Sequence, residues 1–337
     1  ALEQTQVQSQ QVSALKPMLL SRRGWFAFRL GDYDEAREDL TRSLDLARQQ
    51  AMDDEIAFAL YNLGIFNYQF GDYTAALADL QDSLAIWRAA GESHGVAHAL
   101  SIMGIVARER GDPDLAEHYL YESLALYRSA GNRRGVSRCL NLLGLINRDR
   151  GDARQARDLL RESLAICREI GDRRDVAFAC NILGAILYEA GEYDGARDYC
   201  QESLDIREQI GERRGMAFSL HDLGNVARAL QKHEVAWAYL RRALSIAVEI
   251  QAAPLALYVM TGIAELQASQ GNRPSALELA YFVLNQRSSF EMANERASAL
   301  IEQHAPQLDD AELQEVQLIA RNHQFDELVF DLLNRDL

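Results

Sequence analysis

The chain has 337 residues, of which 48% are hydrophobic and 25% are charged, and its formal net charge is −15 at pH 7. No apolar run approaches the roughly 18 residues that a membrane-spanning helix needs, and no secretory signal segment is evident. The excess of acidic residues disfavours wholesale binding to nucleic-acid phosphates.

Residues 1–16 stand apart from the rest of the chain. Residues 1–12 match the phase of a second helix of the repeat that follows, and Pro17 is expected to open the first complete unit. The chain also starts at Ala1 without methionine. We therefore expect residues 1–16 to be the remnant of a preceding repeat, in a fragment of a longer protein.

Residues 17–287 contain a block that recurs every 40 residues, about seven times. Four series of residues keep this interval, with Gln231 as the only lapse: Gly64, Gly104, Gly144, Gly184 and Gly224; Gly31, Gly71, Gly111, Gly151, Gly191 and Gly271; Ala36, Ala76, Ala116, Ala156, Ala196, Ala236 and Ala276; and Leu44, Leu84, Leu124, Leu164, Leu204, Leu244 and Leu284. A fixed period in this range predicts a solenoid of stacked supersecondary units.

Each block predicts two helices joined by a tight turn. In residues 55–90, apolar residues at helical spacing predict a first helix, and Gly64 in its middle costs about 1 kcal/mol relative to alanine. Its recurrence predicts a close crossing of two helices where no Cβ fits. Gly71 suits the end of this helix, Asp72 can cap the next one, and the second helix points Trp87 inward.

After Gln286 the repeat signature is lost. Residues 288–337 contain three amphipathic segments, at about 290–304, 309–322 and 324–334, and Asp309 with Glu312 forms a variant of the capping box. Because the last repeat of an array must shield its apolar face, we expect these segments to be capping helices.

The repeat resembles the tetratricopeptide repeat (TPR) family in its long, 40-residue form. The resemblance rests on Leu-Gly pairs such as Leu63-Gly64, on the Gly-Asp-Tyr turn at Gly71 to Tyr73, and on the small Ala76. It implies an all-α, right-handed α-solenoid (superhelix) of stacked helix-turn-helix repeats with a C-terminal helical cap. Among members of this type, the chain resembles the C-terminal sensor arrays of bacterial STAND-type signalling ATPases and regulators.

No catalytic set is evident, so we expect no enzymatic activity, metal or cofactor. Gly91 to Gly95 match G-x-S-x-G, but the serine of that hydrolase motif needs a strand-to-helix turn, and Ser93 lies in a loop between repeats. His94 and His98 lack an evident third ligand for a metal. The four cysteines lie in predicted helices without a C-x-x-C pair, which indicates buried, reduced thiols in a cytosolic protein: Cys139, Cys167, Cys180 and Cys200.

The resemblance implies that the first helices line a concave groove. One face of each first helix is formed by four residues that are three, four and three positions apart. The residue types on this face vary between repeats and include many aromatic, Asn and Arg side chains, the types that dominate recognition surfaces. The candidate partner-binding residues are Phe58, Tyr61, Tyr68, His98, Arg108, Arg138, Asn141, Arg148, Phe178, Asn181, Tyr188, Phe218, His221, Asn225 and Arg228. Asn141 and Asn181 could grip peptide amides, and the arginines could pair with carboxylates. The alternative is a solvated face whose arginines pair with Glu109, Asp149 or Glu189.

A second arginine series lies in the loops between repeats: Arg133-Arg134, Arg173-Arg174 and Arg213-Arg214. These residues could contact a second domain or an acidic partner, or could pair locally with Asp172 and Glu212.

The leading hypothesis is a scaffold that binds a protein or peptide, as the sensor domain of a larger bacterial signalling protein with an upstream effector or NTPase domain. The alternatives are a self-association module and, against the net charge, a nucleic-acid-binding module.

Overall fold

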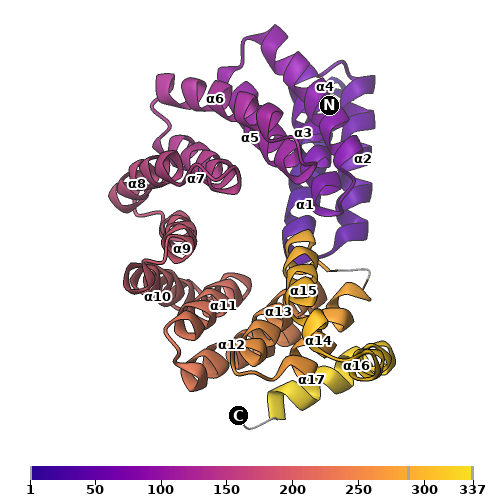
Figure 1. Cartoon of the computed structure of the whole chain (residues 1–337). Helices are drawn as coiled ribbons and strands as arrows, with labels where there is room; N and C mark the ends of the chain where they lie inside the picture. Colours follow the sequence, from indigo (N-terminus) through magenta and orange to yellow (C-terminus); the bar gives the residue numbers. More distant parts are fainter. Residues whose placement is uncertain (1, 287–288, 335–337) are drawn as a thin grey trace. The chain divides into compact units, whose positions relative to one another are not determined.

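The computed structural model describes residues 2–286 and 289–334, with side chains described from residue 15 onward within these ranges. The described residues form 17 α-helices and one short 3-10 turn, and they contain no strand (Figure 1). The prediction of an all-α fold of stacked helix-turn-helix repeats is therefore confirmed.

The helices alternate between a first and a second helix of each repeat. The first helices are α1 (Leu2–Leu30), α3 (Asp53–Gln69), α5 (Ser93–Glu109), α7 (Arg133–Asp149), α9 (Arg173–Glu189), α11 (Arg213–Ala229) and α13 (Ala253–Ser269). The second helices are α2 (Tyr33–Gln49), α4 (Tyr73–Ala90), α6 (Pro113–Ser129), α8 (Ala153–Ile170), α10 (Tyr193–Ile210), α12 (His233–Glu249) and α14 (Arg273–Leu284).

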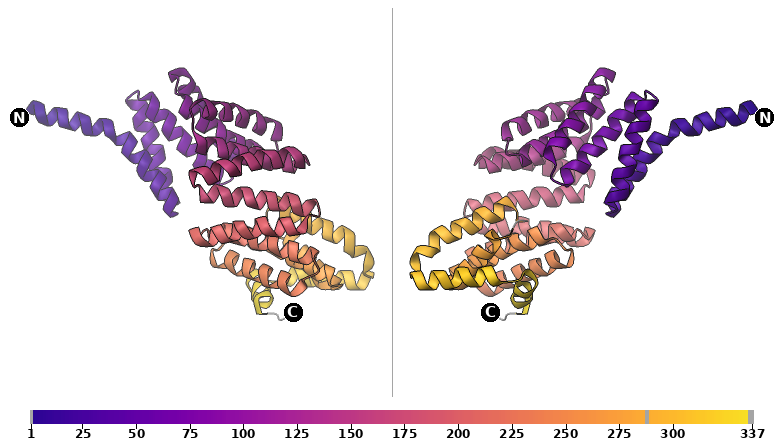
Figure 2. Two further views of the ribbon diagram at one scale, coloured as in Figure 1. Left: turned by 90° about the vertical axis from the view of Figure 1, so that its left-hand side faces the viewer. Right: turned by 90° about the vertical axis from the view of Figure 1, so that its right-hand side faces the viewer.

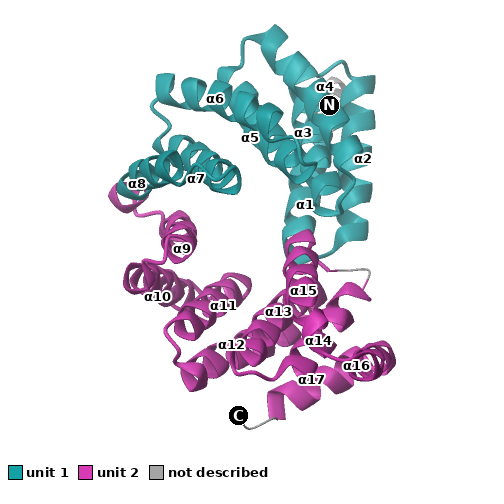
Figure 3. Cartoon of the chain, in the orientation of Figure 1, with its two compact units in different colours: residues 1–166 teal, residues 167–337 magenta. Residues whose placement is uncertain are grey.

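The chain divides into two compact units, residues 1–166 and residues 167–337, with the boundary inside α8 (Figure 3). Within each unit, consecutive helices pack against each other, and the first helices also contact one another in succession, α1 to α3 to α5 to α7 in unit 1 and α9 to α11 to α13 in unit 2. Each unit therefore has a layer of first helices and a layer of second helices. We call the open side of the first-helix layer the first-helix face.

The recurrent mid-helix glycines mark close crossings between the two helices of a repeat. A Cβ added to Gly104 of α5 would lie 2.6 Å from Leu120 Cγ of α6, and one added to Gly224 of α11 would lie 2.7 Å from Leu240 Cγ of α12. Such distances are far below van der Waals contact, so only glycine allows the helices to approach this closely. The predicted crossing is confirmed.

Glycines near the start of two first helices, Gly95 and Gly135, face large side chains on the preceding second helix. A Cβ added to Gly95 would lie 2.4 Å from Trp87, and one added to Gly135 would lie 2.4 Å from Tyr127. Trp87 is buried, as predicted, and Gly95 leaves room for its ring. The large side chain eight positions earlier therefore explains why glycine stands at Gly95 and Gly135.

The turn chemistry also follows the prediction. Asp72 and Asp112 accept hydrogen bonds from the backbone N–H groups of Ala75 and Leu115, as N-caps do. The glycines that end the first helices have positive φ angles, for example +77° at Gly71. Gln231 stands where the other repeats have this turn glycine. It adopts the same left-handed conformation, with φ +59°, which is strained for a residue with a Cβ.

No helix begins at Pro17, the residue expected to open the first complete unit. A single helix, α1, runs from Leu2 to Leu30 with Pro17 inside it, and its N-terminal half projects beyond α2 (Figure 2). Proline removes only one backbone hydrogen bond from a helix, and the helix continues on both sides of it. The carbonyl of Pro17 accepts a hydrogen bond of 2.6 Å from Ser43, the bond that Ala57 makes with Ser83 one repeat later. Pro17 thus lies within the first helix of the first repeat rather than at its start.

The three C-terminal segments form α15 (Glu291–His304), α16 (Asp310–Asn322) and α17 (Phe325–Asn334), close to the expected bounds. The capping box between Asp309 and Glu312 is present. Helices α15 and α16 contact α14, and α17 contacts α12. These helices therefore cover second helices near the end of unit 2, as a cap would, while α15 also contacts the first helix α13.

Candidate functional site

The predicted binding face consists of four positions on each first helix, which form four columns at 40-residue intervals. Column 1 contains Phe58, His98, Arg138, Phe178 and Phe218; column 2 contains Tyr61, Ser101, Asn141, Asn181 and His221; column 3 contains Ile65, Ile105, Leu145, Ala185 and Asn225; and column 4 contains Tyr68, Arg108, Arg148, Tyr188 and Arg228.

Three of the five residues of column 2 are buried. Asn141 and His221 have exposed fractions of only 2% and 0%, and Ser101 is also buried. The first helices pack against each other along this column: a Cβ added to Gly262 of α13 would lie 3.0 Å from the ring of His221 on α11. The expectation that Asn141 and His221 are available to a ligand is therefore wrong, because packing buries these two side chains, whereas Tyr61 and Asn181 in the same column are half-buried.

Asn225 in column 3 is also buried, with 6% exposure, against the expectation of an open position. Its side-chain oxygen accepts a hydrogen bond of 3.4 Å from Arg296 of α15, a helix outside the regular repeats. A neighbour that the 40-residue pattern does not reveal therefore covers this position.

In unit 1, columns 1 and 2 form an aromatic cluster around His98. The His98 ring lies 6.2 Å from Tyr61, 5.6 Å from Tyr127 and 4.4 Å from His94, measured between ring centroids. Burial, with smaller contributions from His94 and Arg138, lowers the pKa of His98 to about 4, and burial raises the pKa of Tyr61 to about 12. His98 is therefore neutral at pH 7.

Two other column 1 residues of unit 1 are exposed. Phe58 is 38% exposed, a high value for a large apolar side chain, and Arg138 is also exposed. The positive charge of Arg138 contributes to the lowered pKa of His98 and opposes the raised pKa of Tyr61. A cation beside partly buried rings can bind an acidic or aromatic group of a ligand.

The arginines of column 4 in unit 1 have partners. Arg108 donates hydrogen bonds to Glu109 at 2.8 Å and to Asp149 at 2.7 Å, and Arg148 also pairs with Asp149 at 2.7 Å. For Arg108 and Arg148, the alternative reading of local ion pairs is confirmed. Tyr68 in the same column is half-buried and packs 6.1 Å from Tyr73.

In unit 2, the candidate residues are engaged more deeply. Asn181 of α9 donates a hydrogen bond to Asp222 of α11, and Tyr188 accepts one of 3.0 Å from Arg228. Phe178 is half-buried, and Phe218 packs 5.8 Å from Tyr258 of α13. The first-helix face of this unit is therefore built largely of residues that already have partners.

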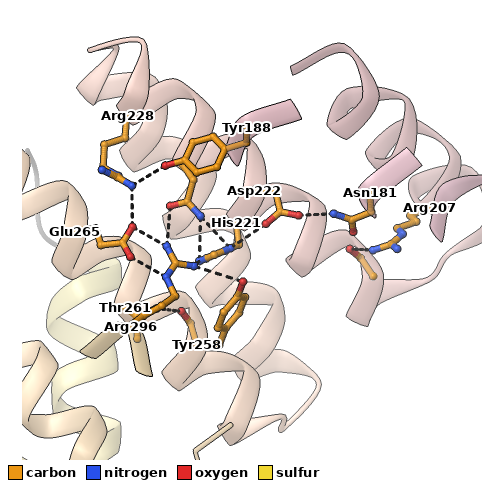
Figure 4. A network of polar contacts seen from close by, with 12 residues as sticks. Asn181, Tyr188, Arg207, His221, Asp222, Arg228, Tyr258, Thr261, Glu265 and Arg296 are labelled. Atoms are coloured by element: carbon orange, nitrogen blue, oxygen red, sulfur yellow. Dashed lines mark hydrogen bonds and ion pairs between the residues drawn. The ribbon is translucent and has the colours of Figure 1, made fainter. Parts of the chain in front are cut away.

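A polar network joins α11, α13 and α15 of unit 2 (Figure 4). Arg296 of α15 donates to both carboxylate oxygens of Glu265, at 2.7 and 2.6 Å, and Arg228 donates to the same carboxylate at 2.8 Å. Arg296 also lies 3.1 Å from the Nε2 atom of His221 and 5.5 Å from the centre of the Tyr258 ring. Burial alone would raise the pKa of Glu265, but Arg296 and Arg228 together lower it below its ordinary value.

Sequence reasoning missed Glu265 and Arg296, although the repeat register contained a signal for Glu265. Glu265 continues column 3, where most sister repeats carry an aliphatic residue such as Ile105 or Leu145. Arg296 lies beyond the regular repeats, so the register gave no signal for it. A charged residue at a position that is otherwise apolar in an array indicates a special contact, because an unpaired buried charge would be strongly destabilising.

Several other predictions can be compared with the structure. Ser93 begins α5 rather than ending a strand, so G-x-S-x-G is not a hydrolase elbow here. The four cysteines are free and buried, as predicted. Among the loop arginines, Arg173 donates to Gln209, Arg174 lies 3.9 Å from Glu212 and Arg213 pairs with Glu249, which supports local pairing.

The family model of the tetratricopeptide repeat matches residues 17–89, 55–129, 95–169 and 175–249. The chain belongs to the tetratricopeptide repeat family. A search of curated proteins found no match. Among the described residues of this TPR protein, no helix is both long enough and apolar enough to cross a membrane.

Solved structures share the fold at low sequence identity. The apo form of the quorum sensor NprR from B. thuringiensis has 16% identity and a TM-score of 0.69, and the match covers 99% of this chain and 95% of NprR. NprR in complex with its cognate peptide NprX matches at 17% identity and a TM-score of 0.56, over 95% of this chain and 88% of NprR. A STAND protein with a TPR sensor from Pyrococcus horikoshii has 18% identity and a TM-score of 0.64, over 95% of this chain and 49% of that protein.

Proposed function

We propose that this TPR array binds a protein or peptide segment on the first-helix face of unit 1 and has no catalytic role. The observation that carries the proposal is the placement of Phe58 and Arg138. Both side chains are exposed in column 1, which also contains the half-buried His98, and Phe58 lies about one helical turn from Tyr61 on α3, whereas Arg108 and Arg148 are held in ion pairs.

The chemistry of this cluster favours a ligand with an apolar or aromatic anchor and a neighbouring carboxylate. An aromatic group buried against Phe58 and Tyr61 would supply most of the binding free energy, since such anchors dominate recognition surfaces. The forked guanidinium of Arg138 would donate two hydrogen bonds to a carboxylate and so orient the segment. His98 is neutral and could donate or accept one hydrogen bond.

The proposal is tested with a random peptide library displayed on phage and selected against the whole chain. The affinities of the selected peptides are then measured by fluorescence anisotropy. Arg138→Ala and Phe58→Ala should each weaken binding at least tenfold, which corresponds to about 1.4 kcal/mol. Arg128→Ala is the matched control, because Arg128 is an exposed arginine on the second helix α6, where it pairs with Glu162. Equal affinity for the wild type and both variants would contradict the proposal that this face binds the ligand.

The array would serve as the sensing part of a larger signalling protein. This step is supported by the likeness to the NprR quorum sensor and to a STAND protein with a TPR sensor. In this account, ligand binding selects one arrangement of the stacked helices and so biases an effector or NTPase domain in the same protein. Sequencing the whole gene tests it directly: a reading frame without any such domain argues against the proposal.

One observation favours self-association as a second function. Four apolar residues lie on one face of α1 and are 50% to 86% exposed: Leu15, Leu19, Phe26 and Leu30. One repeat later, the equivalents of Leu19 and Phe26 are Ala59 and Phe66, which are buried against the preceding repeat. The stripe on α1 is therefore a stacking face that could accept a helix from a second copy.

Light scattering over a range of concentrations tests self-association through this stripe. The wild-type chain should show a concentration-dependent rise in mass, and Leu19→Glu should abolish it. Glu38→Gln, an exposed change on the neighbouring helix α2, is the control. A wild-type chain that stays monomeric at every concentration dismisses this function.

A further inference from the structure

Arg296 fills a site that is built like a receptor for a guanidinium group. Its forked side chain meets the Glu265 carboxylate at two points, a His221 ring nitrogen at 3.1 Å, the Tyr258 hydroxyl at 3.4 Å and the Asn225 oxygen at 3.4 Å, while its guanidinium also lies over the Tyr258 ring (Figure 4). The acceptors come from α11 and α13, and the guanidinium comes from α15. Four polar groups from two repeats therefore converge on one cation.

The acceptors are held in place independently of α15. Arg228 pairs with Glu265 at 2.8 Å and donates to Tyr188 of α9 at 3.0 Å, and His221 contacts Asp222 at 3.3 Å. Glu265 would therefore keep one cationic partner if Arg296 left. The pocket is preorganised by first helices of the array, so it does not depend on Arg296 for its shape.

Helix α15 packs against α14 and α13 mainly through small side chains, with Ile301 half-buried beside them. Among its residues, only Ala293, Ala297 and Leu300 are buried, and two of these three are alanines. A short 3-10 turn, Ala305–Gln307, follows the helix directly. Because an alanine buries only a small apolar area, the charged hydrogen bonds of Arg296 add to the attachment of α15.

We propose that the first-helix face of α11 and α13 is a binding site for the guanidinium of an arginine-bearing helix, and that α15 occupies it as a displaceable intramolecular ligand. A partner helix with an arginine at the matching position competes with Arg296 for Glu265 and releases α15. This inference concerns unit 2 and does not depend on the ligand proposed for Phe58 and Arg138 in unit 1.

The first test uses hydrogen exchange of the whole chain, followed by mass spectrometry. In Arg296→Ala, the amides of α15 should exchange at least tenfold faster than in the wild type, while those of α11 and α13 should change less than threefold. Arg321→Ala, which removes an exposed arginine from α16, is the control and should leave α15 protected. Equal loss of protection in α11, α13 and α15 would show that α15 is an integral part of the core and would overturn the proposal.

The second test asks whether the vacated pocket takes a guanidinium in trans. Ethylguanidinium is titrated into Arg296→Ala and should raise its melting temperature by several degrees, whereas ethylammonium, which lacks the fork, should not. The double variant Arg296→Ala/Glu265→Gln should show no response. If ethylguanidinium stabilises Arg296→Ala no more than the double variant or the wild type, the pocket is not a guanidinium site.

The third test supplies the helix itself. A fluorescent peptide with the sequence of residues 291–304 should bind Arg296→Ala at least tenfold more tightly than it binds the wild type, in which Arg296 already fills the pocket. The same peptide with alanine in place of its arginine should not discriminate between the two chains. Equal binding of both peptides to Arg296→Ala would overturn the role of the arginine. The peptide selection on Phe58 and Arg138 is unaffected by either result, so failure of one proposal is distinguishable from failure of the other.

Discussion

The hydroxyl of Ser83 on α4 donates a hydrogen bond of 2.7 Å to the backbone carbonyl of Ala57 on α3. The bond is buried, and it recurs at 40-residue intervals through Ser43, Ser123, Ser163 and Ser203. It ties the second helix of each repeat to the first helix near the start of the hairpin. Ala243 stands at the next place in the series and has no hydroxyl to donate.

Removal of this bond should destabilise the array locally. Ser83→Ala leaves the carbonyl of Ala57 with one fewer partner in a buried place, so the free energy of unfolding should fall by about 1–2 kcal/mol. Urea denaturation measures the change. Ser129→Ala is the matched control, because Ser129 also donates to a carbonyl but is exposed. A loss no larger than that of Ser129→Ala would mean that the serine series does not stabilise the fold.

Gly104→Ala should be destabilising although alanine is the better helix former. The added methyl group would lie 2.6 and 2.9 Å from two carbons of Leu120, so α5 and α6 must move apart. We expect overpacking to outweigh the roughly 1 kcal/mol gain in helix propensity and to give a net loss of about 1–3 kcal/mol.

Gly195→Ala provides the comparison for Gly104→Ala. Its added Cβ would meet only the end of the Leu187 side chain, at 3.2 Å. This variant should be neutral or slightly stabilising in the same thermal or urea unfolding experiment. Equal effects of the two substitutions would contradict the close-crossing account.

Stability should fall on acidification partly because of His98. Its pKa is lowered to about 4 by burial, with His94 and Arg138 contributing, while the unfolded value is near 6.5. The unfolded state therefore binds the extra proton first, and stability is lost as the pH falls from about 6.5 to 4. We expect this part of the loss to be about 1–2 kcal/mol, after discounting for the partial exposure of His98.

The variant His98→Gln isolates that contribution. The wild-type chain should lose more free energy of unfolding than His98→Gln when the pH is lowered from 7 to 4, as measured by urea denaturation at each pH. His118→Gln, an exposed histidine on α6, should behave like the wild type. Parallel pH profiles for His98→Gln and the wild type would show that His98 is not held neutral by its surroundings.

The cysteines should be inert in the folded protein. Burial raises the pKa of Cys139 to about 11 and that of Cys180 to about 12, and Cys167 and Cys200 are buried as well. Since the thiolate is the reactive form, none should react quickly with Ellman's reagent at pH 8. All four should react in 6 M guanidinium chloride. Rapid labelling of any cysteine under native conditions would contradict the burial described here.

Much of the fold could be predicted because each repeat must meet the same physical demands. A helix crossing with no room for a Cβ selects glycine at positions such as Gly64, and a left-handed turn selects glycine again at positions such as Gly71. An aspartate then caps the next helix. These constraints are local or act within one hairpin, so they leave a trace at a fixed interval.

Prediction failed where contacts join different repeats or lie outside the 40-residue register. Column 2 was expected to face a ligand, but Asn141 and His221 are buried because neighbouring first helices meet there. Helical periodicity reports which residues share a face and not how closely the next helix approaches. Pro17 was likewise expected to open a helix, but α1 runs through it.

By itself, the sequence determined the all-helical TPR array, its turns, its buried cysteines and the bounds of the C-terminal helices, since periodic packing writes each of these into the residue pattern. Only the tertiary structure decided which arginines are paired and which are exposed, and it alone brought Arg296 to Glu265. The contact between Arg296 and Glu265 joins residues 31 positions apart, and no local periodicity encodes it. Contacts of this kind form only when the packing of the whole unit brings one helix against another.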